Sequence, residues 1–331
     1  MLLIWTGFIL FILALLALDL GVFNRKAHVI SVKEALGWSA LWIALGLAFS
    51  VFVYFSYENH WLGIGQKIDA VDGIVNDGRT ATIKYLTGYV IEKSLSVDNI
   101  FVIALIFSYF AVPAIYQHRV LFWGILGALI MRGVMIGVGA TLIARFHWIL
   151  YLFGAFLIVT AVKMLLMKTD HAEPGRNPIV RLTRRLFRVT DQYHEHHFIV
   201  GGALTPLALA LIVVETTDVV FAVDSIPAIF AITADPFLVF TSNVFAILGL
   251  RSLYFALAGM MNKFRYLKVS LAIVLAVVGV KMLAADWFKA ALGKNFNFYL
   301  LGMIFLILAA GIIASRLRAS RADIAADRIG T

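Results

Sequence analysis

Acidic side chains recur at matching positions in two strongly apolar segments of the chain. Glu92 and Asp98 are six residues apart in the first segment, and Asp218 and Asp224 are six apart in the second. Carboxylates with neighbouring amide and hydroxyl oxygens form a hard ligand set that suits Mn²⁺, Mg²⁺ or Ca²⁺ rather than Zn²⁺ or Cu⁺. The candidate metal ligands are five carboxylates and two neutral side chains: Glu92, Asp98, Glu215, Asp218, Asp224, Asn99 and Ser225.

The six-residue spacing decides how these carboxylates can meet. On an unbroken helix, six residues turn the side chain by about 600°, so the two acids of one segment point about 120° apart. Both face one cavity only if the helix is kinked or unwound between them. Ser94, Ser96 and Pro227 favour such an irregularity.

Four basic residues accompany the acids in the apolar segments: Arg132, Lys163, Arg251 and Lys281. One charged residue at a bilayer centre costs about 2.5–3.5 kcal/mol on insertion scales, so each of them must be paired, hydrated or bound to an ion. We expect the four cations to compensate the carboxylates when no metal is bound. For these four cations themselves, purely structural ion pairing is the favoured reading.

Composition places these charges in a membrane protein. Of 331 residues, 62% are hydrophobic and 14% are charged, whereas soluble proteins carry about 25% charged residues. This excludes a soluble enzyme, a nucleic-acid-binding domain and a disordered tail protein. The absence of cysteine excludes disulfides and thiolate metal sites. We therefore predict an all-α polytopic membrane protein that is not an enzyme, has no organic cofactor and has the lipid bilayer as its surroundings.

Nine stretches reach the length of about 20 apolar residues that a bilayer requires. They are 2–22, 35–57, 84–110, 120–143, 148–167, 199–230, 237–258, 267–285 and 297–315. The third and the sixth are long enough to be bent or broken inside the membrane.

An internal repeat organises the middle of the chain. The segments 96–100 and 222–226 are similar, as are 125–127 and 247–249, and 162–166 and 280–284. Each copy holds three spans, so the second copy enters the membrane from the opposite side, as in many secondary transporters. The predicted units are 1–83, with two spans and an outer loop; 84–167, the first repeat; 168–198, a linker; 199–285, the inverted second repeat; and 286–331, the last span and tail.

The distribution of Lys and Arg predicts the orientation. Most of those outside the repeat spans fall in the loops after spans one, three, five and seven and in the C-terminal tail. The positive-inside rule then places the N-terminus outside and the C-terminus in the cytoplasm. The linker 168–198 mixes arginines with apolar residues and predicts an amphipathic helix on the anionic inner surface. The outer loop 58–83 is acidic, and we expect it to be merely solvated.

One histidine tract lies outside the spans. His194, Glu195, His196 and His197 form a short run of metal-ligating side chains in the linker. The run does not have the spacing of a zinc-protease motif, and its role is left open.

The segments Glu92 to Asn99 and Glu215 to Pro227, with Thr241-Ser242-Asn243 and Phe153-Gly154-Ala155-Phe156, carry a family resemblance. In them the chain resembles the TerC family, particularly its Alx branch of bacterial inner-membrane proteins. The resemblance implies Mn²⁺ export, with the acidic residues of the two motifs lining the ion path, and the family's name refers to tellurium resistance.

These lines lead to one expectation with two alternatives. We expect a secondary transporter that exports Mn²⁺ as its transported substrate from the cytoplasm by alternating access, with protons as the counter-ion. One alternative is a transporter of Ca²⁺ or another divalent cation. The other, which a related plant branch suggests, is a partner in membrane-protein insertion or metal delivery without transport of its own. We expect no nucleic-acid partner, and the sequence does not specify an oligomeric state.

Overall fold

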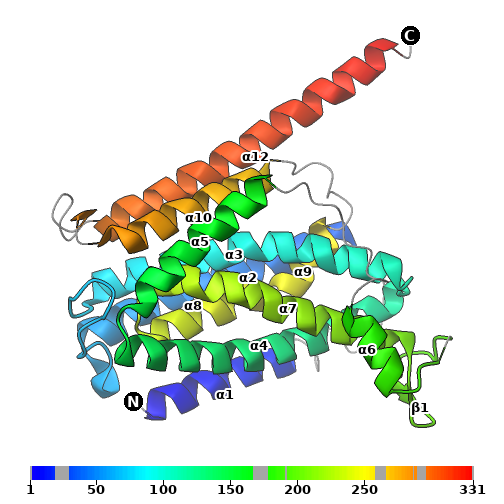
Figure 1. The fold of residues 1–331 in the computed structure, drawn as a ribbon, viewed down its shortest axis with the longest axis horizontal. Coiled ribbons are helices and arrows are strands. Elements are labelled where there is room, and N and C mark those ends of the chain that lie inside the picture. The colour runs from blue at the N-terminus through cyan, green and yellow to red at the C-terminus, as the bar shows by residue number, and fades with distance from the viewer. Residues whose placement is uncertain are drawn as a thin grey trace.

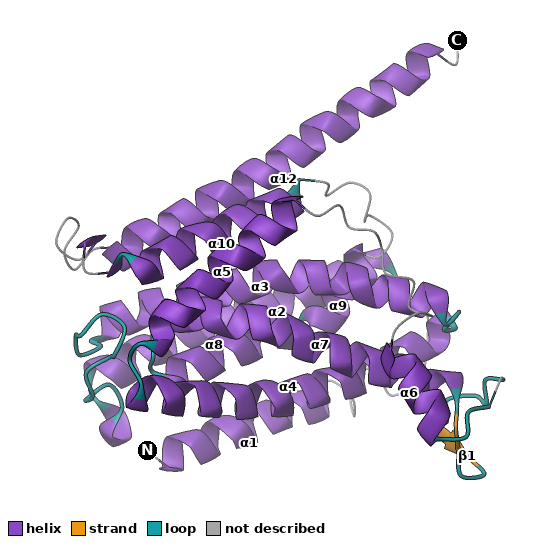
Figure 2. Ribbon diagram, in the orientation of Figure 1, coloured by secondary structure: helices purple, strands orange, loops and turns teal. Residues whose placement is uncertain are grey.

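The protein is a bundle of α-helices with one short β-hairpin (Figures 1 and 2). The structure, a computed structural model, describes residues 2–18, 30–166, 178–190, 192–257, 266–285, 287–288 and 296–329. Its helices are α1 (Leu2–Leu18), α2 (Val32–Glu58), α3 (Gly78–Tyr109), α4 (Ala114–Arg145), α5 (Ile149–Leu166), α6 (Pro178–Leu186), α7 (Pro206–Phe230), α8 (Pro236–Leu248), α9 (Leu250–Leu257), α10 (Leu267–Leu283) and α12 (Phe296–Ile329). The 3-10 turn η2 is Trp61–Gly63, and the hairpin pairs β1 (Ile199–Val200) with β2 (Ala203–Leu204).

The helices confirm the predicted all-α membrane class. Six of the described helices are long and apolar enough to cross a membrane: α2, α4, α5, α7, α8 with α9 taken together, and the first part of α12. The shorter α1 is also apolar. Each of the nine predicted stretches falls on a described helix.

Two details of the predicted spans are wrong. Neither α3 nor α7 is broken, and the interruption instead lies at Gly249, between α8 and α9. The sixth stretch also begins later than predicted, because 199–204 forms the β-hairpin. Thr205 then caps α7 by accepting a hydrogen bond from the amide of Ala208, and Pro206 occupies the first turn, where its missing N–H is not needed.

The helices form two groups (Figure 1). In this view α5, α10 and α12 make a tilted upper layer, and the remaining long helices form the body below it. At one point α5 and α10 approach backbone to backbone, because a Cβ added to Gly279 would lie 2.9 Å from the carbonyl oxygen of Gly154. The body is centred on α8, which is mostly apolar and nearly all buried. A helix that is hydrophobic on most of its surface is expected in this position.

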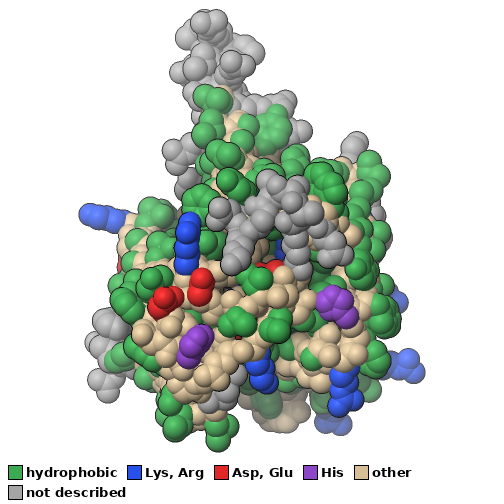
Figure 3. Space-filling model, turned by 90° about the vertical axis from the view of Figure 1, so that its left-hand side faces the viewer, with side chains coloured by type: hydrophobic (Ala, Val, Ile, Leu, Met, Phe, Trp, Pro, Cys, Tyr) green, Lys and Arg blue, Asp and Glu red, His purple; other side chains and the backbone are tan. Residues whose placement is uncertain are grey.

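The two ends of the bundle differ. We call the end that carries the 59–77 segment the loop end and the opposite end, which carries α6, the α6 end. In Figure 1, α3 runs from the loop end to the α6 end, and α7 runs in the opposite direction, as the inverted repeat requires. Figure 3 looks onto the loop end, where hydrophobic side chains surround a more polar centre.

The described part of the linker contains the helix α6. On α6, Val180 is buried and packs with the core residues of α7, whereas Leu182 and Leu186 are exposed beside the arginines. Residues 168–177 of the predicted linker lie outside the described residues.

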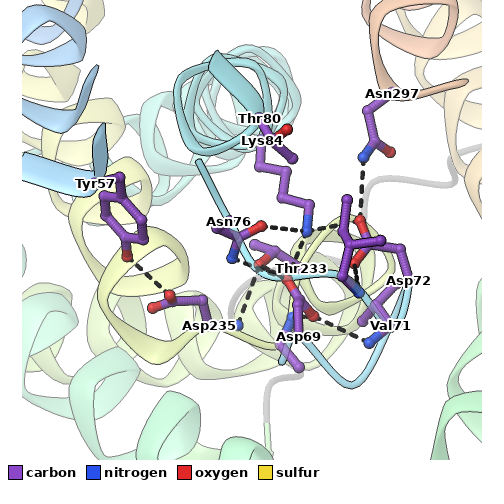
Figure 4. Close-up of polar contacts among 12 residues, drawn as sticks. Tyr57, Asp69, Val71, Asp72, Asn76, Thr80, Lys84, Thr233, Asp235 and Asn297 are labelled. Carbon is purple, nitrogen blue, oxygen red and sulfur yellow. Dashed lines mark hydrogen bonds and ion pairs between the residues drawn. The ribbon is translucent and has the colours of Figure 1, made fainter. Parts of the chain in front are cut away.

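The acidic loop 58–83 is not merely solvated, which corrects our expectation. Lys84, which is buried on α3, lies 2.8 Å from Asp69 and 2.7 Å from Asp72 (Figure 4). Asp69 also accepts hydrogen bonds from the hydroxyl of Thr233 and the amide of Ala234, at the turn between α7 and α8. The loop turns inward because a buried lysine needs carboxylate partners, so 58–83 ties α3 to the second repeat.

Two buried aspartates at this end lie in opposite electrostatic settings. Burial alone would raise the pKa of Asp69, but Lys84 and hydrogen bonds from Thr233 and the Val71 amide outweigh it and hold the pKa below its usual value. Burial does raise the pKa of Asp235, whose main partner is the neutral hydroxyl of Tyr57, at 2.8 Å. One carboxylate is therefore stabilised as an anion, and the other is not.

Candidate ion-binding site between the two repeats

A buried arginine joins the first acids of the two motifs. The guanidinium of Arg132, on α4, forms an ion pair with Glu92 of α3 and donates to Asp218 of α7 from two nitrogens, at 3.1 and 3.2 Å. It also donates to Ser225 and Asn243, at 3.1 Å each. We call these five residues the arginine cluster. Arg132 and Glu92 are 2% and 0% exposed, whereas Asp218 is 14% exposed, so the ion pair between Arg132 and Glu92 is the buried centre of the cluster.

The cluster supplies hydrogen-bond acceptors to the guanidinium of Arg132, which lies among α3, α4, α7 and α8. The amide group of Asn243, on α8, donates to Glu92 at 3.4 Å while its oxygen accepts from Arg132. A buried arginine is tolerated when carboxylates and hydrogen-bond acceptors fill its fork of donors. Here both repeats and α8 supply those acceptors. Arg132 pairs with Glu92 and Asp218, and its role in compensating them when no metal is bound stays a prediction.

The second acids of the two motifs face a different space. Asp98 and Asp224 line a cavity of about 630 Å³ between α3 and α7 on one side and α5 and α10 on the other. The hydroxyl of Thr160 donates to Asp224 at 3.2 Å. Asn99 and Ser225 also line the cavity, which brings the neutral candidate ligands to the same wall.

Two lysines line the part of the cavity nearer the α6 end. Lys163 lies in the last turn of α5, and Lys268 is the second residue of α10. Lys163 is exposed, whereas Asp98 and Asp224 are half-buried. The cavity is open and is lined mainly by apolar side chains. Among its described lining residues, two carboxylates lie on the wall formed by α3 and α7, and two lysines lie toward the α6 end, which we call its mouth.

The continuity of α3 explains why the carboxylates separate into two groups. Because the helix is unbroken, the six-residue spacing keeps Glu92 and Asp98 on different faces. Glu92 meets Asp218 in the arginine cluster, and Asp98 meets Asp224 at the cavity. Each group therefore combines equivalent positions of the two repeats.

Three further predicted site residues belong to neither group. Glu215 is half-buried against Gly127 of α4, where a Cβ would overlap the carboxylate. Arg251, with Asp218 and Asn99, lines a small void of about 20 Å³. Lys281 is buried, donates to the carbonyl oxygen of Ala231 and lies 5.9 Å from the centre of the Phe296 ring.

Three residues of the site were missed from the sequence. The sequence marks Asn243 only through the family resemblance, although an amide in an apolar span is itself a signal of a buried polar contact. Lys268 lies next to a loop, where a cation does not by itself indicate a site. Thr160 carried no signal, because a single threonine in an apolar helix commonly bonds its own backbone.

The histidine tract forms a separate surface group. Glu195, His196 and His197 are exposed, and one ligand atom of each lies within 4.8 Å of the others. His194 contributes its carbonyl oxygen to the ring of His197 at 3.3 Å. These residues lie in the linker and are not among those lining the cavity.

Comparisons with known proteins agree with this architecture. Residues 77–323 match the family described as integral membrane protein TerC family. The chain belongs to the TerC family. The match includes both acidic motifs, both repeats and the arginine cluster.

Curated relatives extend over almost the whole chain. An uncharacterised membrane protein of Myxococcus xanthus is 49% identical over 96% of this chain and 93% of its own length. Alx of Escherichia coli K12, whose name describes it as a candidate membrane-bound redox modulator, is 46% identical over 92% of both chains. Alx of Salmonella typhi is 45% identical over 94% of this chain and 93% of its own length. No solved structure matches the chain at a significant level.

Proposed function

We propose that this integral membrane protein is a secondary transporter that exports Mn²⁺ from the cytoplasm. The observation that carries the proposal is the pair Asp98 and Asp224, one from each repeat, on the wall of one open cavity between the repeats. Substrate sites of inverted-repeat transporters lie at such an interface. Manganese itself comes from the family resemblance, whereas the residues support a hard divalent cation.

In this proposal the cation enters the cavity from the α6 end. That end carries the arginine-rich α6, and the positive-inside rule makes it the cytoplasmic side of the inner membrane. The cation exchanges water for carboxylate oxygens of Asp98 and Asp224, with Asn99 and Ser225 as neutral ligands. Protons are the natural counter-ion, because a carboxylate that loses a metal in a region of low dielectric constant gains by taking up a proton.

The arginine cluster has a different task. Its two carboxylates already share the guanidinium of Arg132, and displacing a guanidinium bound by four acceptors would cost a cation much of its binding energy. We assign the cluster to holding α3, α4, α7 and α8 together behind the binding wall. Ser225 contacts Arg132 and also lines the cavity, so it joins the cluster to the site.

The redox term in the Alx name does not require thiol chemistry in this chain. The chain has no cysteine, so its own side chains supply no thiol–disulfide couple. A transporter that changes the metal content of the cell accounts for the residues described above without such a couple. The rival functions are transport of Ca²⁺ or another divalent cation through the same site, and a role in membrane-protein insertion or metal delivery without flux.

Flux through purified protein in liposomes tests the proposal. We expect Mn²⁺ to move down its gradient in protein-containing liposomes, and to move faster when an opposing proton gradient is imposed. Competition by Ca²⁺ or Mg²⁺ at equal potency would assign the site to divalent cations in general. Absence of flux for all three metals, with the protein folded and inserted, would overturn the transporter and favour the insertion or delivery role.

A further inference from the structure

The two outer helices of the repeats can be aligned residue by residue. The matching segments Val162–Leu166 and Val280–Ala284 extend without a gap, so that the first residue of α5, Ile149, aligns with the first residue of α10, Leu267. In this alignment Lys163 corresponds to Lys281. The other pairs used below are Met164 with Met282, Thr160 with Val278, Leu157 with Leu275, and Leu150 with Lys268.

Two pockets of different size occupy equivalent places in the repeats. The cavity of about 630 Å³ has Lys163, Met164 and Lys268 in its lining. A second pocket, of about 260 Å³, has in its lining the three aligned residues Lys281, Met282 and Leu150. It also contacts Val71 and Gly73, which places it at the loop end. We call it the loop-end pocket.

The deeper parts of the two pockets differ. In the large cavity, Thr160 and Leu275 form part of the lining that reaches Asp98 and Asp224. Their aligned partners, Val278 and Leu157, are both 0% exposed and belong to one packed core. The loop-end pocket therefore corresponds to the mouth of the large cavity. The residues that correspond to the interior of that cavity are packed together and leave no space.

Two contacts hold this region closed. Lys281, which lines the pocket, donates to the carbonyl oxygen of Ala231 at the end of α7, so its side chain joins α10 to the helix that carries Asp224. Gly154 and Gly279 let α5 and α10 meet backbone to backbone next to it. The positions aligned with these glycines are Ala272 and Ala161, which are small enough for a similar approach at the α6 end.

We propose that the loop-end pocket is the closed exit of the ion path and that Lys163 and Lys281 are equivalent gate residues. The α5–α10 pair tilts across α3 and α7, so that the cavity at Lys163 closes while Lys281 leaves Ala231 and the loop-end pocket deepens to reach Asp98 and Asp224. The proposal rests on the transport function proposed above and identifies the path on the far side of the site. Exchange of conformation between inverted repeats is the physical basis of such an alternation.

Because the chain has no cysteine, single cysteines can report on each side separately. Met164→Cys probes the cavity, and its aligned partner Met282→Cys probes the loop-end pocket. The measurement is the rate at which a membrane-impermeant thiol reagent modifies each cysteine from its own side of the membrane in oriented vesicles. We expect Met164→Cys to react faster than Met282→Cys, as the open and closed pockets imply.

Combining Lys281→Met with each single-cysteine variant removes the hydrogen bond from Lys281 to the carbonyl oxygen of Ala231. We expect the Met282→Cys rate to rise about tenfold or more and the Met164→Cys rate to fall. The matched change Lys163→Met, made at the aligned lysine, should not raise the Met282→Cys rate. Unchanged rates in Lys281→Met, or a rise at both probes, would overturn the gate.

A second variant keeps the test decisive if Lys281→Met does not reach the membrane. Val159 lines the cavity and is 65% exposed, so Val159→Trp should fold while obstructing closure of the cavity. We expect it to lower the Met282→Cys rate and leave Met164→Cys reactive; an unchanged Met282→Cys rate would contradict the proposal. Neither assay uses a metal. If the two cysteine modification rates change in opposite directions but no Mn²⁺ flux is found, only the proposed transport of Mn²⁺ is refuted. If Mn²⁺ flux is found but the two rates do not change in opposite directions, only the proposed gate is refuted.

Discussion

Four carboxylates, two from each repeat, lie in two contrasting surroundings. Glu92 and Asp218 share the buried guanidinium of Arg132. Asp98 and Asp224 instead line an open cavity, in which the two lysines lie nearer the mouth. The residue types and the spacing are almost the same in both pairs. The difference teaches that the helix face, and not the carboxylate itself, decides whether an intramembrane acid holds helices together or is available to a cation.

The contrast between the two pairs of carboxylates would be contradicted most clearly if the protein folded normally without Arg132. Replacing Arg132 by Ala leaves Glu92 and Asp218 as buried, uncompensated charges, and removing one partner of a buried pair costs about 3–5 kcal/mol. We expect Arg132→Ala to lose most of its folded protein, measured as the monodisperse fraction extracted from membranes. The triple variant Arg132→Met, Glu92→Gln, Asp218→Asn removes all three charges and should recover much of that fraction. Normal levels of the single variant would show that the cluster is not structural.

The cavity pair should behave in the opposite way. Asp98→Asn and Asp224→Asn remove a ligand charge from a wall that faces an open space, so the amount of folded protein should stay near that of the unmodified chain. Changes around metal ligands cost about 10–100-fold in affinity, and loss of a ligand should cost at least as much. We therefore expect Mn²⁺ flux at limiting metal to fall about 100-fold. Loss of folded protein in step with loss of flux would instead favour a structural charge network.

The loop end offers the same contrast in a pair of aspartates. The pKa of Asp69 lies below its usual value, so the ionised form stabilises the fold at neutral pH, and that contribution is lost only as the pH falls through the depressed pKa. The pKa of Asp235 is raised, so its contribution is present at low pH and is lost as the pH rises through that pKa. At pH 7, Asp69→Asn should lower the unfolding temperature, and Asp235→Asn should leave it unchanged or raise it. Equal losses in both variants would contradict the assignment.

The smallest expected effect concerns Thr160. Its hydroxyl donates to Asp224 at 3.2 Å, and a hydrogen bond to a charged group contributes about 1.5–3 kcal/mol. Water in the open cavity can hydrogen-bond to Asp224 in place of the hydroxyl and so offset part of this free energy. We therefore expect Thr160→Val to change the apparent Mn²⁺ affinity only a few-fold, with normal protein levels. Thr141→Val is the matched control, because the hydroxyl of Thr141 bonds the carbonyl oxygen of Gly137 within its own helix. An equal effect of the two changes would argue against a role for Thr160 at the site.

Much of the fold was predictable, because lipid allows few backbone arrangements. A span without water must be helical, so hydrophobic length alone located every helix that carries the site. The break at Gly249 was not predicted, since the sequence drew attention to Ser94, Ser96 and Pro227 instead. Pro227 lies in the last turn of α7 without ending it.

The site was predicted as a set of residues but not as an arrangement. The spacing of Glu92 and Asp98 already implied different faces of an unbroken helix, and only the assumed kink merged them into one site. The pairing of Lys84 with Asp69 was beyond sequence reasoning, because it depends on how a loop folds back over the end of α3. Local pattern specifies the direction of a side chain within its helix, whereas tertiary packing decides what it meets.

Binding of Mn²⁺ to the purified protein tests the central claim most directly. Free aqueous Mn²⁺ gives a sharp electron paramagnetic resonance signal that is lost on binding, so a titration reads occupancy without any need for transport. The account predicts that the protein binds Mn²⁺, that the double variant Asp98→Asn, Asp224→Asn does not, and that the triple variant of the arginine cluster retains binding. Retained binding in the double variant, or loss of binding confined to the triple variant with its fold intact, would contradict the account.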